Sequence, residues 1–150
     1  MRIMNGFRTP LLVFLLPAVL AQAGQHFTVR ASFVPPAAKG ADGSIAVTFT
    51  ALDPDVHVNE EPAARLKLDE AQSVLVDKQK PAPSRTEAFD PEKARYLDLS
   101  APVLFPVALA AQAPHGDQSV KATVTYFYCS KREGWCRKGT AALDVAVAVP

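Results

Sequence analysis

Residues that commonly build metal sites are scarce in this sequence. Among 150 residues there are two cysteines and two methionines, and Met1 and Met4 both lie at the very start. Methionine clusters of the kind expected in a copper carrier are therefore absent. The three histidines, His26, His57 and His115, stand singly, without the paired spacing of metal ligands. We predict no metal and no other cofactor, although two cysteines and one histidine together are a ligand set that copper or zinc accepts.

An excess of charge of either sign is also absent. Sixteen lysines and arginines stand against 15 aspartates and glutamates, a net charge of +1. This balance favours neither nucleic acid nor a membrane surface as a partner. The sequence also lacks a glycine-rich phosphate loop and an interpretable Ser–His–Asp arrangement. His57 lies close to Asp53 and Asp55, and we interpret these residues as a polar turn rather than a catalytic dyad.

A hydrophobic run long enough to cross a membrane is missing as well. The apolar stretch from Leu11 to Leu20 is about half the roughly 20 residues that a membrane-spanning helix needs. It follows a basic start and precedes the small-residue site Ala21-Gln22-Ala23. This pattern predicts a secretory signal peptide over residues 1–23, with an uncleaved anchor as the alternative. After cleavage near Ala23, residues 24–150 are expected to form one soluble domain in the periplasm or outside the cell, without stable membrane insertion.

Alternation of apolar and polar residues is the main structural signal that is present. The strands predicted from this period of two cover residues 26–34, 44–52, 64–68, 73–77, 103–109, 119–128 and 140–149. Turn-rich segments with proline, glycine and aspartate separate them, and no helix is expected beyond a turn near residues 90–95. We therefore predict an all-β, antiparallel sandwich. Pro106 places its strand at a sheet edge or a bulge, because proline cannot donate a ladder hydrogen bond.

The two cysteines lie between the last two predicted strands. If Cys129 is opposed to Cys136, Ala122 faces Leu143 and the apolar faces of both strands coincide. A slip of one residue would put those faces on opposite sides of the sheet. The turn then becomes Lys131–Gly134, in which the glycine supplies a positive φ. Opposed Cα atoms lie about 4.5–5.5 Å apart, a separation that a disulfide can bridge.

The surroundings of the cysteines leave two functions open. Alternation places Cys129 on the outer face of the sheet, away from the main core. Nearby cations lower the pKa of a thiol, which favours thiol–disulfide exchange. A short disulfide in an exported domain is also a common structural staple. Phe127 and Trp135 are candidates for an apolar docking surface, or for ordinary packing. The cations are Lys131, Arg132, Arg137 and Lys138, against the single acid Glu133.

The segment Val124-Thr-Tyr-Phe-Tyr-Cys-Ser-Lys-Arg-Glu-Gly-Trp-Cys136 resembles the end of the N-terminal periplasmic domain of DsbD-type thiol:disulfide interchange proteins. In that family a V-T-Y-x-x-C strand leads through a short loop to glycine, an aromatic residue and cysteine. Residues 55–59 with 64–68 are similar to its early strand-turn-strand, and residues 100–107 to a later L-x-x-P-V segment. The cysteines here are separated by six residues, where the family commonly has five.

The resemblance implies an immunoglobulin-like sandwich whose cysteine pair cycles between disulfide and dithiol. Cys129 and Cys136 would be the redox-active centre, and Cys129 would form the mixed disulfide with a partner. The partners implied are periplasmic thioredoxin-like proteins and a separate membrane electron donor. Phe89 is the candidate for the aromatic cap that shields the pair in the family. The alternative is a non-catalytic immunoglobulin-like interaction module with a structural disulfide.

Overall fold

The computed structural model describes residues 26–38, 41–81 and 95–150, and within them the fold is all-β, without a helix. The predicted signal peptide, Phe89 and most of the predicted turn near residues 90–95 lie outside the described residues. The strands are β1 (Phe27–Val34), β2 (Gly43–Ala51), β3 (Val56–Val58), β4 (Arg65–Leu68), β5 (Leu75–Asp77), β6 (Val103–Leu109), β7 (Gly116–Ser130) and β8 (Trp135–Val149).

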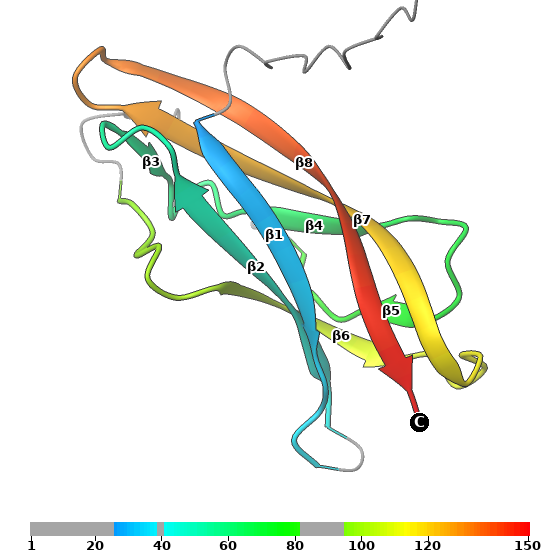
Figure 1. The fold of residues 1–150 in the computed structure, drawn as a ribbon. Coiled ribbons are helices and arrows are strands. Elements are labelled where there is room, and N and C mark those ends of the chain that lie inside the picture. The colour runs from blue at the N-terminus through cyan, green and yellow to red at the C-terminus, as the bar shows by residue number, and fades with distance from the viewer. Residues whose placement is uncertain (1–25, 39–40, 82–94) are drawn as a thin grey trace, which may run out of the picture.

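The strands form two antiparallel sheets of four strands each (Figure 1). The first sheet has the order β1-β2-β6-β5. In the second, β7 pairs with β8 along one edge and with β3 and β4, one after the other, along its other edge. Figure 1 shows the long β7–β8 hairpin running the length of the molecule, with its tip beside β3. The all-β, antiparallel prediction is confirmed.

The core lies between the sheets and is built by every second residue of their strands. Fully buried valines of β7 and β8 meet buried residues of β2 and β6 in one hydrophobic cluster. Ala122 pairs with Leu143 and Val120 with Val145, so the predicted register of the hairpin is confirmed. This register puts the apolar faces of both strands on the inner side of the sheet.

The prediction that Pro106 marks an edge strand or a bulge is wrong. β6 lies inside its sheet, and Pro106 pairs in continuous register with Ser44 of β2. The other side of β6 is covered by β5 only from Val107 onward. Opposite Pro106, the β5 strand has already ended. The Pro106 carbonyl accepts a hydrogen bond from the backbone N–H of Lys78, the residue after β5, at 3.0 Å. The missing N–H of proline therefore faces a position where no ladder partner needs it.

Gly139 of β8 gives the ring of Tyr126 its place in the core. The two residues are opposed, and a Cβ built at Gly139 would meet the ring at 2.7 Å. The ring is fixed from its other sides by Phe27 and Phe49, whose centroids lie 6.0 and 5.0 Å away. Burial, with a smaller contribution from Tyr128, raises the pKa of the Tyr126 phenol.

We expect Gly139→Ala to lower the free energy of unfolding by about 1–3 kcal/mol, because the added methyl overpacks a rigid aromatic cluster. Denaturant titration measures the change. Thr140→Ala, one residue further along β8 on the exposed face, is the matched control and should change stability by less than about 0.5 kcal/mol. Equal stability of the two variants would show that the Tyr126 ring can move aside for the added methyl group without lowering the free energy of unfolding.

Candidate functional site

The tip of the β7–β8 hairpin is a four-residue turn, Lys131–Gly134, as predicted. The N–H of Gly134 donates to the carbonyl of Ser130 at 2.9 Å, and the N–H of Glu133 donates to the Ser130 hydroxyl at 3.1 Å. Gly134 has a φ of 70°, which only glycine adopts without a steric penalty. These bonds hold the last two residues of the turn to the buried serine that precedes it, and so bring the two strands together.

Cys129 and Cys136 form a disulfide across this hairpin. They are directly opposed, their Cα atoms are 4.0 Å apart, and their sulfurs are bonded. Opposed residues of an antiparallel pair project from the same face of the sheet. Since Val120, Ala122 and Val124 of β7 point into the core, the alternating pattern places Cys129 on the outer face.

The outer position does not make both cysteines accessible. Cys129 is only 2% exposed although it is not a member of the hydrophobic core cluster, whereas Cys136 is partly exposed. The disulfide therefore has one covered end and one end that faces solvent. For a reaction with another molecule, this difference makes Cys136 the more accessible of the two residues.

His57 lies beside the covered end. It is the register partner of Cys129 on β3, so that His57, Cys129 and Cys136 form a row across three neighbouring strands on one face of the sheet. The interpretation of His57 as part of a polar turn is wrong, because Val56 and Val58 on either side of it are buried and make this segment a strand. The polar residue between them consequently points to the outer face.

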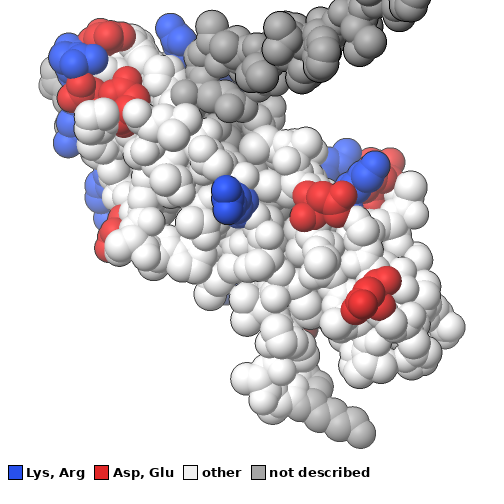
Figure 2. Space-filling view, viewed as in Figure 1, with Lys and Arg blue, Asp and Glu red and all other residues white. Residues whose placement is uncertain are grey.

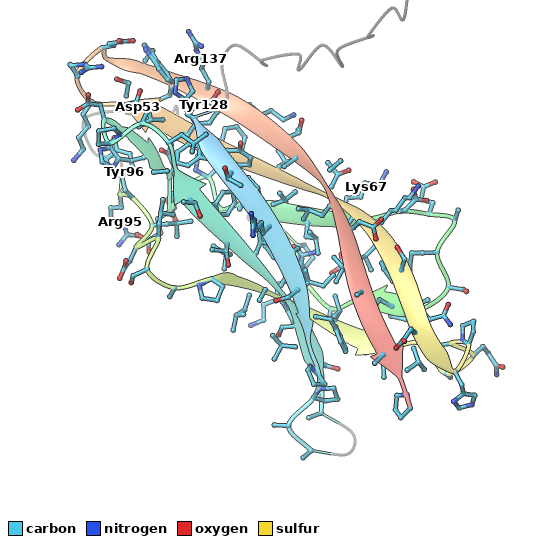
Figure 3. The ribbon with its side chains drawn as sticks, viewed as in Figure 1. Asp53, Lys67, Arg95, Tyr96, Tyr128 and Arg137 are labelled. Atoms are coloured by element: carbon cyan, nitrogen blue, oxygen red, sulfur yellow. A yellow bond between two sulfur atoms is a disulfide. The ribbon has the colours of Figure 1, made fainter. Side chains whose placement is uncertain are left out.

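Tyr96 packs on the far side of His57. Its ring centroid lies 5.0 Å from that of the imidazole, and Tyr96 forms an isolated bridge with Asn59, the residue that follows β3. The ammonium group of Lys131 lies 4.6 Å from the centre of the Tyr96 ring. Figure 3 shows Tyr96 beside the end of β3. The turn of the hairpin is thus tied to the segment that flanks β3.

An ion pair makes a second tie. Arg132 contacts the Asp55 carboxylate at 2.5 Å and that of Glu133 at 3.8 Å. In Figure 2, positive and negative side chains gather together at this end of the molecule. The local excess of cations expected from the hairpin alone is reduced, because Asp55 comes from a distant part of the sequence. Lys138 remains exposed on the outer face, two residues after Cys136.

Phe127 and Trp135 do not form one docking surface. Phe127 precedes Cys129 by two residues and shares its face, whereas Trp135 shares the inner face with Tyr128, 5.8 Å away between ring centroids. The indole also lies 5.4 Å from His26 and under the guanidinium of Arg137, 4.4 Å from its centre. Trp135 therefore packs at the end of the core, while Phe127 stays close to the disulfide.

Asn59 is a second buried polar residue of this region, besides Ser130. The residue is 1% exposed, and neither its amide oxygen nor its amide nitrogen has a hydrogen-bond partner among the described residues. Its backbone N–H donates to the carbonyl of Phe127 at 2.8 Å. A buried amide without partners costs about 1–3 kcal/mol, so it is an unusual choice for a strand end beside a disulfide.

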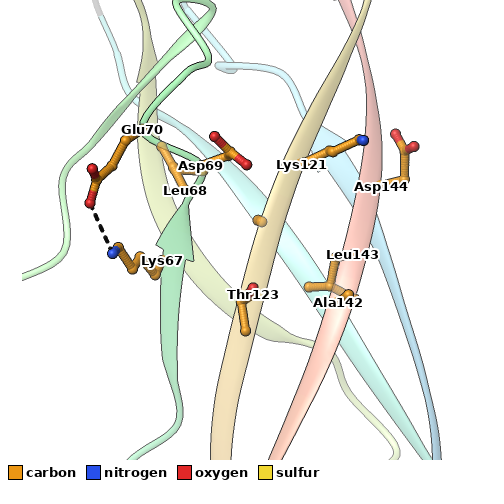
Figure 4. A pocket seen from close by; sticks show the side chains of 10 residues that line it. Lys67, Leu68, Asp69, Glu70, Lys121, Thr123, Ala142, Leu143 and Asp144 are labelled. Atoms are coloured by element: carbon orange, nitrogen blue, oxygen red, sulfur yellow. Dashed lines mark hydrogen bonds and ion pairs between the residues drawn. The ribbon is translucent and has the colours of Figure 1, made fainter.

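A separate groove lies further along the outer face (Figure 4). It has a volume of about 660 Å³ and open sides, and Thr123 and Ala142 are among the residues that line it. Charges of both signs line it, and Lys67 is already paired with Glu70 at 3.0 Å. Thr123 and Cys129 are six positions apart on β7, about 20 Å of extended strand, so the groove is distinct from the disulfide.

Comparison with models of known protein families, with curated proteins and with solved structures gave no match. Within the described residues there is no helix that is long and apolar enough to cross a membrane. Nor do three or more histidine, cysteine, aspartate or glutamate side chains in that part of the chain form a group that could hold a metal ion. The disulfide is the chemically distinctive feature of the described structure.

Sequence reasoning found the cysteine pair but missed the residues that cover it. The apolar–polar alternation of Val56-His57-Val58 is a signal that would have placed His57 on the outer face of a strand, instead of in the polar turn that was predicted. Local alternation does not identify Cys129 as the neighbour of His57 across the sheet. Cys129 is 72 positions away, and nothing in either segment specifies that they pair.

Proposed function

We propose that this protein is an exported thiol:disulfide interchange domain, in which Cys129 and Cys136 cycle between disulfide and dithiol. The observation that carries the proposal is the place of the disulfide: it lies outside the core cluster, at the tip of a hairpin, with Cys136 partly exposed. A bond in this place can open without disturbing the packing between the sheets. The described residues would form an immunoglobulin-like sandwich in the periplasm, following a signal peptide.

The exchange reaction requires a partner dithiol, for which a thioredoxin-like protein is the proposed class. A partner thiolate attacks the sulfur of Cys136, a new disulfide forms between them, and the electron pair of the broken bond leaves on Cys129. The second thiol of the partner then attacks this mixed disulfide and releases Cys136. The partner ends oxidised and the Cys129–Cys136 pair ends reduced, and the reverse sequence passes the electrons on. A separate membrane protein is the proposed electron donor.

Accessibility favours Cys136 as the cysteine that forms the mixed disulfide. Direct attack requires the incoming sulfur to approach along the S–S axis, and Cys129 is 2% exposed. The resemblance to the DsbD-type domain pointed instead to Cys129. Cys129 is then the leaving group, and it stays beside the mixed disulfide, where it can act as the resolving thiol.

The test is the reduction potential of the pair combined with trapping of the mixed disulfide. We expect equilibration with glutathione to give a potential above about −300 mV, the limit below which structural disulfides typically lie. A thioredoxin without its resolving cysteine, carrying thionitrobenzoate in disulfide linkage on its remaining cysteine, should form a stable adduct with the Cys129→Ala variant, which retains Cys136. The Cys136 thiolate attacks that disulfide and thionitrobenzoate leaves. The Cys136→Ala variant is the matched control and should form at least tenfold less adduct.

A different outcome would identify the non-catalytic alternative. In that case the disulfide is a staple: its potential lies well below −300 mV, and neither single-cysteine variant forms an adduct faster than an unfolded peptide thiol does. Adduct formation mainly through Cys129 would keep the interchange function and reverse the roles of the two cysteines.

A further inference from the structure

The three side chains in the row His57–Cys129–Cys136 differ in chemistry and in exposure. The sulfur pair occupies two positions, and the third is an imidazole on the covered side of Cys129. Opposed residues in an antiparallel pair have Cβ atoms about 4.5–5.5 Å apart. An imidazole nitrogen on a residue so placed reaches a neighbouring sulfur by a side-chain rotation, without any movement of the backbone.

We propose that His57 is a positioning residue for disulfide exchange, which holds a proton next to Cys129 and stabilises the thiolate that leaves when Cys136 is attacked. This inference rests on the proposed interchange function. It adds to that function the residue that determines which sulfur becomes the stable leaving group.

Charged or titratable groups from the segments around His57 bear on this role. The segment beyond β3 contributes Tyr96, whose ring contacts the imidazole, and the turn contributes Lys131, which lies over the same ring. Asp55, which immediately precedes β3, forms an ion pair with Arg132 at 2.5 Å. Because this carboxylate already has a cationic partner, it competes less for the imidazolium. Lys138 of β8 is a further exposed cation on the outer face, but it lies opposite Phe127, on the far side of β7 from His57.

The proton balance of the step is simple. When the Cys129–Cys136 bond breaks, Cys129 receives the electron pair and becomes a thiolate. An imidazolium at His57 either pairs with this thiolate or gives it a proton, leaving a neutral imidazole and a thiol. In the reverse direction the imidazole takes the proton back, and Cys129 again becomes a nucleophile. Histidine is suited to both directions because its charge changes near neutral pH.

The experiment measures the Cys129 thiol directly, in the full chain with Cys136→Ala, so that a single thiol titrates. Thiolate absorbance at 240 nm is followed against pH with and without His57→Gln. We expect the variant to raise the apparent pKa of Cys129 by about one unit, since an opposite charge within about 4–6 Å typically lowers a pKa by one to three units. His115→Gln, a substitution of an exposed histidine near the opposite end of the hairpin, should leave the pKa unchanged.

The same substitution in the otherwise unchanged protein tests the kinetic role. Reduction by dithiothreitol at pH 6.5 should slow about tenfold in His57→Gln. His57→Lys, which restores a cation, should recover most of the rate and make it less dependent on pH. Unchanged titration and rate in His57→Gln would overturn the inference, and so would an equal effect of Lys131→Gln, which would assign the charge to the turn instead.

Failure of this inference is distinct from failure of the proposed function. If the wild-type pair exchanges with thioredoxin and His57→Gln changes neither the Cys129 titration nor the rate of reduction, only the role of the histidine is contradicted. A wild-type pair that does not exchange at all contradicts the interchange function itself.

Discussion

The double substitution Cys129→Ala with Cys136→Ala is expected to abolish thiol–disulfide exchange and to lower the free energy of unfolding by only about 2–3 kcal/mol. The cysteines are seven positions apart, and closing so short a loop removes little entropy from the unfolded chain. Neither cysteine belongs to the cluster that joins the two sheets. The fold should therefore survive the loss of the bond, while the proposed chemistry should not.

Denaturant titration of three samples separates these effects: the oxidised wild type, the wild type kept reduced, and the double variant. We expect the reduced wild type and the double variant to agree in stability within about 0.5 kcal/mol, since both lack the same cross-link. Exchange is measured by the oxidation of reduced thioredoxin. A double variant that fails to fold would show that the disulfide is primarily a staple, and residual exchange would show that other groups carry the reaction.

The second large effect is expected from Asn59→Asp, which is nearly isosteric and places a carboxyl group where the side chain is almost fully buried. Among the described residues the amide has no hydrogen-bond partner that could stabilise a charge in its place. Burial without a partner raises the pKa of a carboxyl group by up to 3–5 units. A shift of three units corresponds to about 4 kcal/mol, so the variant should be about 4 kcal/mol less stable than wild type at pH 7.

The sign of the pH dependence identifies the cause. The folded-state pKa of the carboxyl group introduced by Asn59→Asp is raised above the unfolded value of about 3.9, so the stability of the variant is greatest below that value. This stability is then lost as the pH rises from about 4 towards the folded-state pKa. We expect the stability difference from wild type to be small at pH 3.5 and to increase steadily to pH 7. Gln112→Glu, the same change of amide to acid at an exposed position, is the control and should show no such trend.

An Asn59→Asp variant that is as stable as wild type at both pH values would contradict the described environment. It would mean that the carboxylate finds a cation or solvent at this position. Equal destabilisation at pH 3.5 and pH 7 would indicate a steric effect instead of a buried charge.

Most strands were predictable because their pattern is local. In β2, for example, Ile45, Val47 and Phe49 are buried residues at every second position, and this alternation is readable without knowing what packs on them. The hairpin register was predictable for the same reason. Only one alignment of β7 with β8 puts both apolar faces on one side and leaves a turn that ends at a glycine.

Pro106 shows where local rules stop. A proline within a strand predicts an edge, and in this fold the strand is interior. The deciding fact is that β5 ends at Asp77, so that no ladder donor is needed at Pro106. That depends on the length and placement of a neighbouring strand, and a sequence window around the proline contains neither.

The amino-acid sequence by itself determined the all-β class, the pairing of Cys129 with Cys136 and the face of the sheet on which they lie, since each follows from alternation and from two strands joined by a short turn. Only the tertiary structure decided that Cys129 is covered, that His57 stands next to it and that Trp135 packs against Tyr128 and His26. The physical reason is that side-chain direction is a property of each strand, whereas the neighbours across a sheet depend on which distant strands pack together. The proposed exchange function rests on the cysteine pair and on the partial exposure of Cys136, and the proposed role of His57 rests on its place beside Cys129.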